Sequence, residues 1–157
     1  MSDNPQVIEL IGGEKGQSIH EEKLSAAGSA IKPGYLIEEL AAGTVQEHST
    51  QAGNSQRLVA LANTSVGGLI TDTYAVGERV RFGAFQSGQK AYLKVAVGTA
   101  AILQGASLQS VGDGTVETLA VAAATTQAQR ESVIGTALEA IDNSAGSAEL
   151  FIKVRMA

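Results

Sequence analysis

Residues 74–116, YAVGERVRFGAFQSGQKAYLKVAVGTAAILQGASLQSVGDGTV, decide the fold of this chain. Short apolar runs alternate with glycines in this stretch, and no helix of ordinary length fits between them. The glycines are Gly77, Gly83, Gly88, Gly98, Gly105, Gly112 and Gly114. Such punctuation is typical of a small, tightly turned β-barrel or β-sandwich. The sequence therefore predicts a mainly β domain with little helix.

The apolar runs themselves alternate with the period of a strand. In residues 78–82, Val80 and Phe82 fall on one side, and Arg79 and Arg81 fall on the other. A period of two predicts strands with one buried face. Within this stretch a further strand is expected at residues 91–97. Before and after it, strands are expected at residues 35–40, 57–63, 115–121, 133–141 and 147–156. Residues 41–56 are small and polar, and we expect a long loop there.

Composition and charge limit the classes of function. The chain has 157 residues, no Cys, no Trp and a formal net charge of -5. Without Cys there is no disulfide framework and no thiolate chemistry. The acidic excess belongs to residues 1–50, which carry eight acids against three lysines. No basic stripe offers phosphate contacts, so we expect no nucleic-acid partner. No apolar run reaches the length of a membrane span and no secretory signal is visible, so we expect no membrane partner and synthesis in a cytoplasm.

Residues 1–30 are expected to form an extended N-terminal arm and linker, and residues 31–157 a β-rich domain. Most of the first 24 residues are polar, and a disordered tail is one interpretation. One apolar patch, Val7–Ile11, favours an arm whose strand adds to the sheet edge of a partner. The candidate binding residues are Val7, Ile8, Glu9, Leu10 and Ile11.

Each candidate catalytic motif in the sequence lacks a residue that its chemistry requires. Residues 83–90, GAFQSGQK, resemble a phosphate-binding loop, but Lys90 does not directly follow a glycine and no Ser or Thr comes after it. We interpret this stretch as a hairpin turn. The two histidines, His20 and His48, lie in polar segments that we interpret as solvated loops, and no G-x-S-x-G motif supplies a nucleophile.

Neither the paired acidic residues nor a cofactor-attachment pattern indicates a reactive site. The adjacent carboxylates Glu21–Glu22 and Glu38–Glu39 would point to opposite faces of a strand. Residues 95–108 share the glycine-turn pattern of biotinyl and lipoyl carrier domains, which present a lysine on a tight hairpin. Lys90 lacks that context, so the carrier alternative lacks its reactive residue. We expect no enzyme activity, no cofactor and no metal site.

The order of these features resembles tailed-bacteriophage capsid decoration, or cement, proteins. An acidic arm is followed by Lys32-Pro33-Gly34-Tyr35 and then by Tyr74-Ala-Val-Gly77-Glu-Arg-Val80. The glycine series ending in Gly112-Asp113-Gly114 comes next, and Ile134-Gly135-x-Ala137-Leu138-Glu139-Ala140 precedes a closing strand. The resemblance covers roughly residues 31–157, and the last of these segments carries most weight.

This resemblance implies a β-tulip domain that sits as a homotrimer on the outer surface of the expanded virion head. Its partner would be the phage major capsid protein, whose subunits it bridges and stabilises, with the arm at Val7–Ile11 clamping neighbouring subunits. The alternatives are another phage structural component, such as a head fibre base or a tail protein, and a carrier-type β-barrel binding domain.

Overall fold

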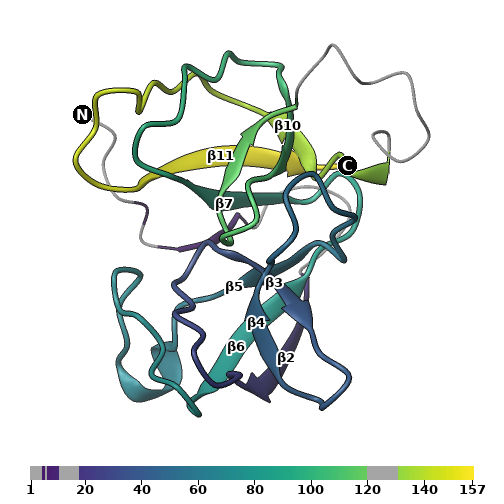
Figure 1. Cartoon of the computed structure of the whole chain (residues 1–157), viewed down its shortest axis with the longest axis vertical. Helices are drawn as coiled ribbons and strands as arrows, with labels where there is room; N and C mark the ends of the chain where they lie inside the picture. The colour runs from purple at the N-terminus through teal and green to yellow at the C-terminus, as the bar shows by residue number, and fades with distance from the viewer. Residues whose placement is uncertain (1–4, 6, 11–17, 120–130) are drawn as a thin grey trace.

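The structure is a computed structural model that describes residues 5, 7–10, 18–119 and 131–157. Its strands form two antiparallel sheets, one above the other in Figure 1. The six-stranded sheet has the order β1 (Glu9–Leu10), β7 (Lys90–Val95), β11 (Leu150–Met156), β10 (Gly135–Ala137), β8 (Ser107–Ser110) and β9 (Val116–Thr118). The five-stranded sheet has the order β2 (Ile19–Leu24), β6 (Arg79–Ala84), β5 (Leu58–Ala60), β3 (Leu36–Glu39) and β4 (Val45–Glu47). The expectation of a mainly β fold is confirmed.

The five-stranded sheet curls until its two edges approach each other. Ser25, just after β2, forms a parallel bridge with Val45 in β4. The amide of Ala26 donates to the carbonyl of Val45 at 2.8 Å. The curled sheet encloses a core cluster made of Ile31, Ile37, Val45, Leu58, Ala60, Tyr74, Val80 and Phe82. The sheet therefore resembles a small barrel that closes at one end.

A second core cluster joins the two sheets. Most of its members come from the six-stranded sheet, including Leu93, Val95, Ile152 and Val154. Leu36 of β3 and Val59 of β5 belong to the same cluster, although both strands lie in the five-stranded sheet. The two sheets thus share buried side chains.

Gly34 joins the backbones of the two sheets. Its amide donates to the carbonyl of Ala60 at 2.8 Å, and its carbonyl accepts from the amide of Lys94 at 2.9 Å. Its φ is +88°, and a Cβ would lie 2.7 Å from a ring carbon of Phe151. Glycine alone meets both demands, since it adopts positive φ freely and carries no side chain.

Three expectations about individual segments are corrected. Residues 83–90 do not form a hairpin, because β6 and β7 belong to different sheets and residues 85–89 carry the chain between them. The expected loop at 41–56 contains β4. The strand expected at residues 57–63 is shorter, as β5 covers only Leu58–Ala60, and the 3-10 turn η1 (Thr64–Val66) follows it.

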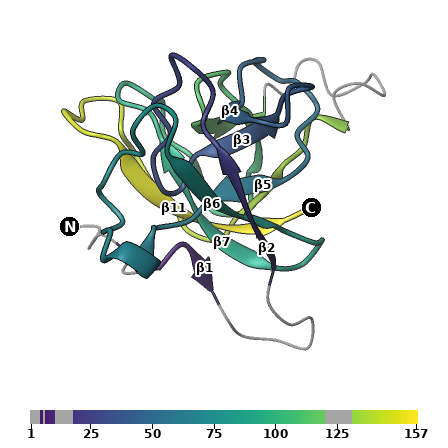
Figure 2. The ribbon, with the colours of Figure 1, turned by 90° about the horizontal axis from the view of Figure 1, so that it is seen from below.

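The N-terminal region also takes part in both sheets. β2 pairs with β6 along its whole length, from Ile19 opposite Ala84 to Leu24 opposite Arg79. β1 lies at the edge of the six-stranded sheet beside β7, as the view from below shows (Figure 2). No helix among the described residues has the length and apolar character of a membrane span.

Candidate binding site at the junction of the sheets

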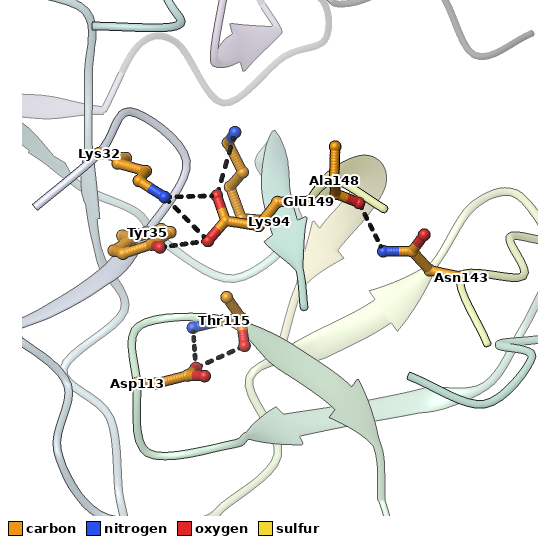
Figure 3. A network of polar contacts seen from close by, with 8 residues as sticks. All are labelled: Lys32, Tyr35, Lys94, Asp113, Thr115, Asn143, Ala148 and Glu149. Carbon is orange, nitrogen blue, oxygen red and sulfur yellow. Dashed lines mark hydrogen bonds and ion pairs between the residues drawn. The ribbon is translucent and has the colours of Figure 1, made fainter. Parts of the chain in front are cut away.

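Three side chains, two of them lysines, meet at the carboxylate of Glu149 (Figure 3). Lys32 Nζ donates to both carboxylate oxygens of Glu149, at 3.1 Å each. The hydroxyl of Tyr35 donates to Oε1 at 2.5 Å. Lys94 Nζ lies 3.5 Å from Oε2. One carboxylate is thus shared by two ammonium groups and a phenol.

The fold brings these residues together from both sheets. Lys32 and Tyr35 flank the turn at Pro33–Gly34 that leads into β3, whereas Lys94 lies in β7 and Glu149 directly precedes β11. Lys94 is the cross-strand partner of Phe151 in the β7–β11 ladder. Its ammonium therefore lies over the Phe151 ring, 4.4 Å from the ring centroid.

The turn before β11 is fixed by Asn143. Its side-chain amide donates to the carbonyl of Ala96 at 2.8 Å and to that of Ala148 at 3.0 Å. Asn143 is itself buried. These two bonds fasten the segment that carries Glu149 to the end of β7. On the other side of the cluster, Asp113 Oδ1 accepts from the amide of Thr115 at 2.9 Å and shapes the turn before β9.

The environment shifts the pKa values of three members of the cluster. Burial raises the pKa of Tyr35, and its hydrogen bond to ionised Glu149 raises it further. Partial burial opposes ionisation of Glu149, but the hydrogen bonds from Tyr35 and Lys32 outweigh it and lower the pKa. Partial burial lowers the pKa of Lys94, and Glu149 offsets part of that effect. Glu149 is therefore an anion at neutral pH, and Tyr35 remains a hydrogen-bond donor.

A surface pocket opens beside this cluster. Its volume is about 480 Å³, and its lining comprises Lys32, Thr71, Lys94, Val97, Ser147, Ala148 and Glu149. Two ammonium groups face one carboxylate there, which leaves the pocket with one positive charge on a chain whose net charge is -5. The arrangement suits binding of an anionic group. Nothing in the sequence indicates this site, because Lys32 and Glu149 are 117 residues apart and no motif links them.

Two of the five candidate arm residues, Glu9 and Leu10, form β1 of the chain's own six-stranded sheet; Val7 and Ile8 directly precede it, and Ile11 lies outside the described residues. Glu9 and Leu10 pair with Ala91 and Lys90 of β7. The side chain of Ile8 is buried, with 3% exposed, whereas Val7 is 56% exposed. Glu9 also accepts from the ring of His20 at 2.7 Å. These contacts lie within one chain, and binding of the segment to a capsid protein stays a prediction.

The interpretation of the histidines as solvated loop residues is wrong for His48, whereas His20 is exposed as expected but lies in a strand. His48 is 2% exposed, and its Nδ1 lies 2.8 Å from Ser110 Oγ and its Nε2 3.2 Å from the carbonyl of Asn54. Because Nε2 faces a carbonyl, Nδ1 accepts from the Ser110 hydroxyl. The contact between the Ser110 hydroxyl and the His48 ring resembles the geometry of a serine–histidine dyad. Both residues are buried, however, and no carboxylate orients the ring. Its role is to fasten β4 to β8.

His20 lies in β2 rather than in a loop. Its Nδ1 is 3.2 Å from one guanidinium nitrogen of Arg81. The other terminal nitrogen of Arg81 donates to Thr64 Oγ1 at 3.0 Å. Together with the bond from His20 to Glu9, these contacts connect β1, at the edge of the six-stranded sheet, to β2 and β6 of the five-stranded sheet. Among the described residues, no group of three or more His, Asp or Glu side chains has the arrangement of a metal site.

No protein-family model matches the chain, and no curated protein is similar to it. Among solved structures, the chain is similar to the crystal structure of the head fiber gp8.5 N base in bacteriophage phi29. The two share 13% sequence identity with a TM-score of 0.52, over 88% of this chain and 95% of that chain. At this identity the likeness shows a shared fold, and it spans nearly the whole of both chains.

Proposed function

We propose that this chain is a non-enzymatic structural protein of a bacteriophage head, displayed on the outer surface of the shell. The observation that carries the proposal is the shared fold with a phage head fiber base, which covers 95% of that chain. The resemblance of the sequence to capsid decoration proteins supports the same class by an independent route. A rigid two-sheet domain with a pocket for an anionic group fits a protein whose task is to bind.

Within that class, the first candidate is a cement protein. It would bind the expanded head as a homotrimer and bridge major capsid protein subunits, after synthesis in the host cytoplasm. Packaged DNA presses outward on the shell, and many modest contacts repeated over all copies resist that pressure. Val7–Ile11 and the Lys32–Lys94 pocket are the surfaces that would make these contacts.

The second candidate is the base of a head fibre, which the structural likeness favours. A fibre base anchors a projecting structure and needs tight attachment at its own position, but it does not need to bridge shell subunits. The two candidates therefore differ in what they do to the shell rather than in where they lie.

Binding to heads that lack this protein tests both candidates. We expect the purified chain to co-sediment with expanded heads and not with unexpanded ones. Cement activity additionally raises the temperature at which the heads release DNA, whereas a fibre base binds and leaves that temperature unchanged. Failure of the chain to co-sediment with any head form would overturn the proposal as a whole.

A further inference from the structure

We infer that the Lys32–Lys94 pocket binds a carboxylate, and that in the assembled head this carboxylate is an Asp or Glu side chain of the shell protein. The identity of this partner rests on the proposed function, whereas the carboxylate preference rests on the pocket alone. The argument uses the acceptor capacity of Glu149, the burial of Lys94 and the net charge of the pocket.

Glu149 is fully used by the groups around it. A carboxylate offers about four acceptor positions, and Glu149 receives two contacts from Lys32, one from Tyr35 and one from Lys94. The Lys94 contact is the longest of these, at 3.5 Å, because Lys32 and Tyr35 hold the carboxylate from the opposite side. The second ammonium group is thus only partly neutralised within the protein.

Lys94 lies in a largely buried position, where an ammonium group that is only partly neutralised is energetically unfavourable. Its side chain is 10% exposed, and the ammonium lies over the face of Phe151. Removal of a charge from water is unfavourable unless an opposite charge compensates it. Lys94 nevertheless lines a pocket that opens to solvent beside Thr71 and Val97. An incoming anion would meet both ammonium groups there and would supply the missing charge.

The net charge of the pocket selects the anion. Two lysines and one carboxylate leave one positive charge, which a single carboxylate neutralises. A phosphate carries between one and two negative charges at neutral pH, and any charge beyond the first would lie near Glu149, which repels it. The walls offer the hydroxyls of Thr71 and Ser147 together with the methyl groups of Val97 and Ala148. This combination suits a short aliphatic acid such as an Asp or Glu side chain.

The chain contains its own control for these lysines. Lys153 lies over the ring of Tyr92, 5.7 Å from its centroid, on the strand pair that carries Lys94 and Phe151. It has the same charge and the same kind of ring contact, but it does not line the pocket. Lys32→Gln, Lys94→Gln and Lys153→Gln therefore remove the same charge from two pocket positions and one position outside.

The first experiment uses butyrate, a monocarboxylate that matches an acidic side chain, and the isolated protein. NMR of the lysine side-chain methylenes should show saturable shifts at Lys32 and Lys94, which disappear in Lys32→Gln and persist in Lys153→Gln. Circular dichroism verifies that each variant is folded. Absence of any shift in the wild type would overturn the proposal that the pocket binds a carboxylate. Inorganic phosphate acting at lower concentration than butyrate would overturn the assignment of a carboxylate.

The second experiment measures binding to heads that lack the protein. We expect Lys32→Gln and Lys94→Gln to raise the dissociation constant about tenfold at low salt, with the difference shrinking as salt increases, while Lys153→Gln stays within about twofold. Wild-type affinity in both pocket variants would overturn the shell carboxylate while leaving the proposed function intact. Butyrate binding without any head binding would instead remove the proposed function, and the shell partner with it.

Discussion

At the scale of single residues, Glu149 couples the stability of the fold to acid. Its pKa in the folded protein lies below its ordinary value, because Tyr35 and Lys32 donate to the ionised form. The unfolded chain therefore binds the proton more readily, and protonation favours unfolding. The stabilisation is fully present above the ordinary pKa of a glutamate and is lost as pH falls through the folded pKa.

Glu149→Gln should lower the free energy of unfolding at pH 7 by about 1 to 2 kcal/mol, since it removes charged hydrogen bonds at a partly exposed site. At pH 3 the difference from the wild type should shrink, because Glu149 then binds a proton in the unfolded wild type, which lowers the stability of the wild type but not that of the Gln variant. Urea unfolding at the two pH values measures this. Exposed Glu21 is the control, and Glu21→Gln should change stability by less than about 0.5 kcal/mol. A deficit in Glu149→Gln that is equal at both pH values would contradict the assignment.

Gly114 is the residue where backbone and packing constraints coincide most closely. Its φ is +83°, and a Cβ would lie 2.6 Å and 2.9 Å from ring carbons of Tyr35. Gly105 has a similar φ of +86°, with nothing within 4 Å of the added atom. Gly105→Ala should cost about 1 kcal/mol from backbone strain alone, and Gly114→Ala should cost at least about 2 kcal/mol because the Tyr35 ring must also move. Thermal unfolding compares the two, and equal losses would show that the contact with Tyr35 is unimportant.

At the scale of elements, β1 depends on Ile8 more than on its short ladder. Only two residue pairs join β1 to β7, and the amide of Tyr92 adds one bond to the carbonyl of Ile8. The buried Ile8 side chain belongs to the cluster that joins both sheets. The segment proposed to bind the capsid is therefore also part of the core.

Ile8→Ala should lower the free energy of unfolding by about 2 kcal/mol or more, which is the usual range for truncating a buried isoleucine. Val7→Ala, one residue away and exposed, should change it by less than about 0.5 kcal/mol. Chemical denaturation of the two variants measures the difference. If the two variants were equally stable, Ile8 would not be a core residue, and an arm detached from the domain would be the better description.

The strands that could be predicted from sequence are those with one buried face. β6 buries Val80 and Phe82 and exposes Arg79, so its period of two is visible in the sequence. β2 could not be predicted, because five of its six residues are exposed and the strand exists through backbone pairing with β6. β4 buries only Val45. Burial leaves a trace in sequence, whereas edge pairing leaves almost none.

The same limit applies to the candidate site and to the connections between sheets. Tyr35 and Lys32 stand near a turn that the Pro33–Gly34 pair predicts, but nothing in the sequence indicates that Glu149 meets them. Residues 85–89 contain turn-forming glycine and polar residues whether they close a hairpin or cross to the other sheet. Tertiary packing makes that choice, and a local pattern does not record it.

At the scale of the whole molecule, the two sheets should unfold together. Leu36 and Val59 of the five-stranded sheet are buried in the cluster of the six-stranded sheet, and Gly34 bonds to both Ala60 and Lys94. Exposing one sheet would therefore expose buried side chains of the other. Small domains with a shared core unfold in one cooperative transition.

Differential scanning calorimetry should accordingly give a single peak whose calorimetric and van't Hoff enthalpies agree. Val59→Ala provides the sharper test, because Val59 lies in a strand of one sheet and packs in the cluster of the other. It should shift the single peak to lower temperature without splitting it, and tyrosine fluorescence and far-ultraviolet circular dichroism should report the same midpoint. Two resolved peaks, of which only one moves in Val59→Ala, would show that the two sheets are independent units.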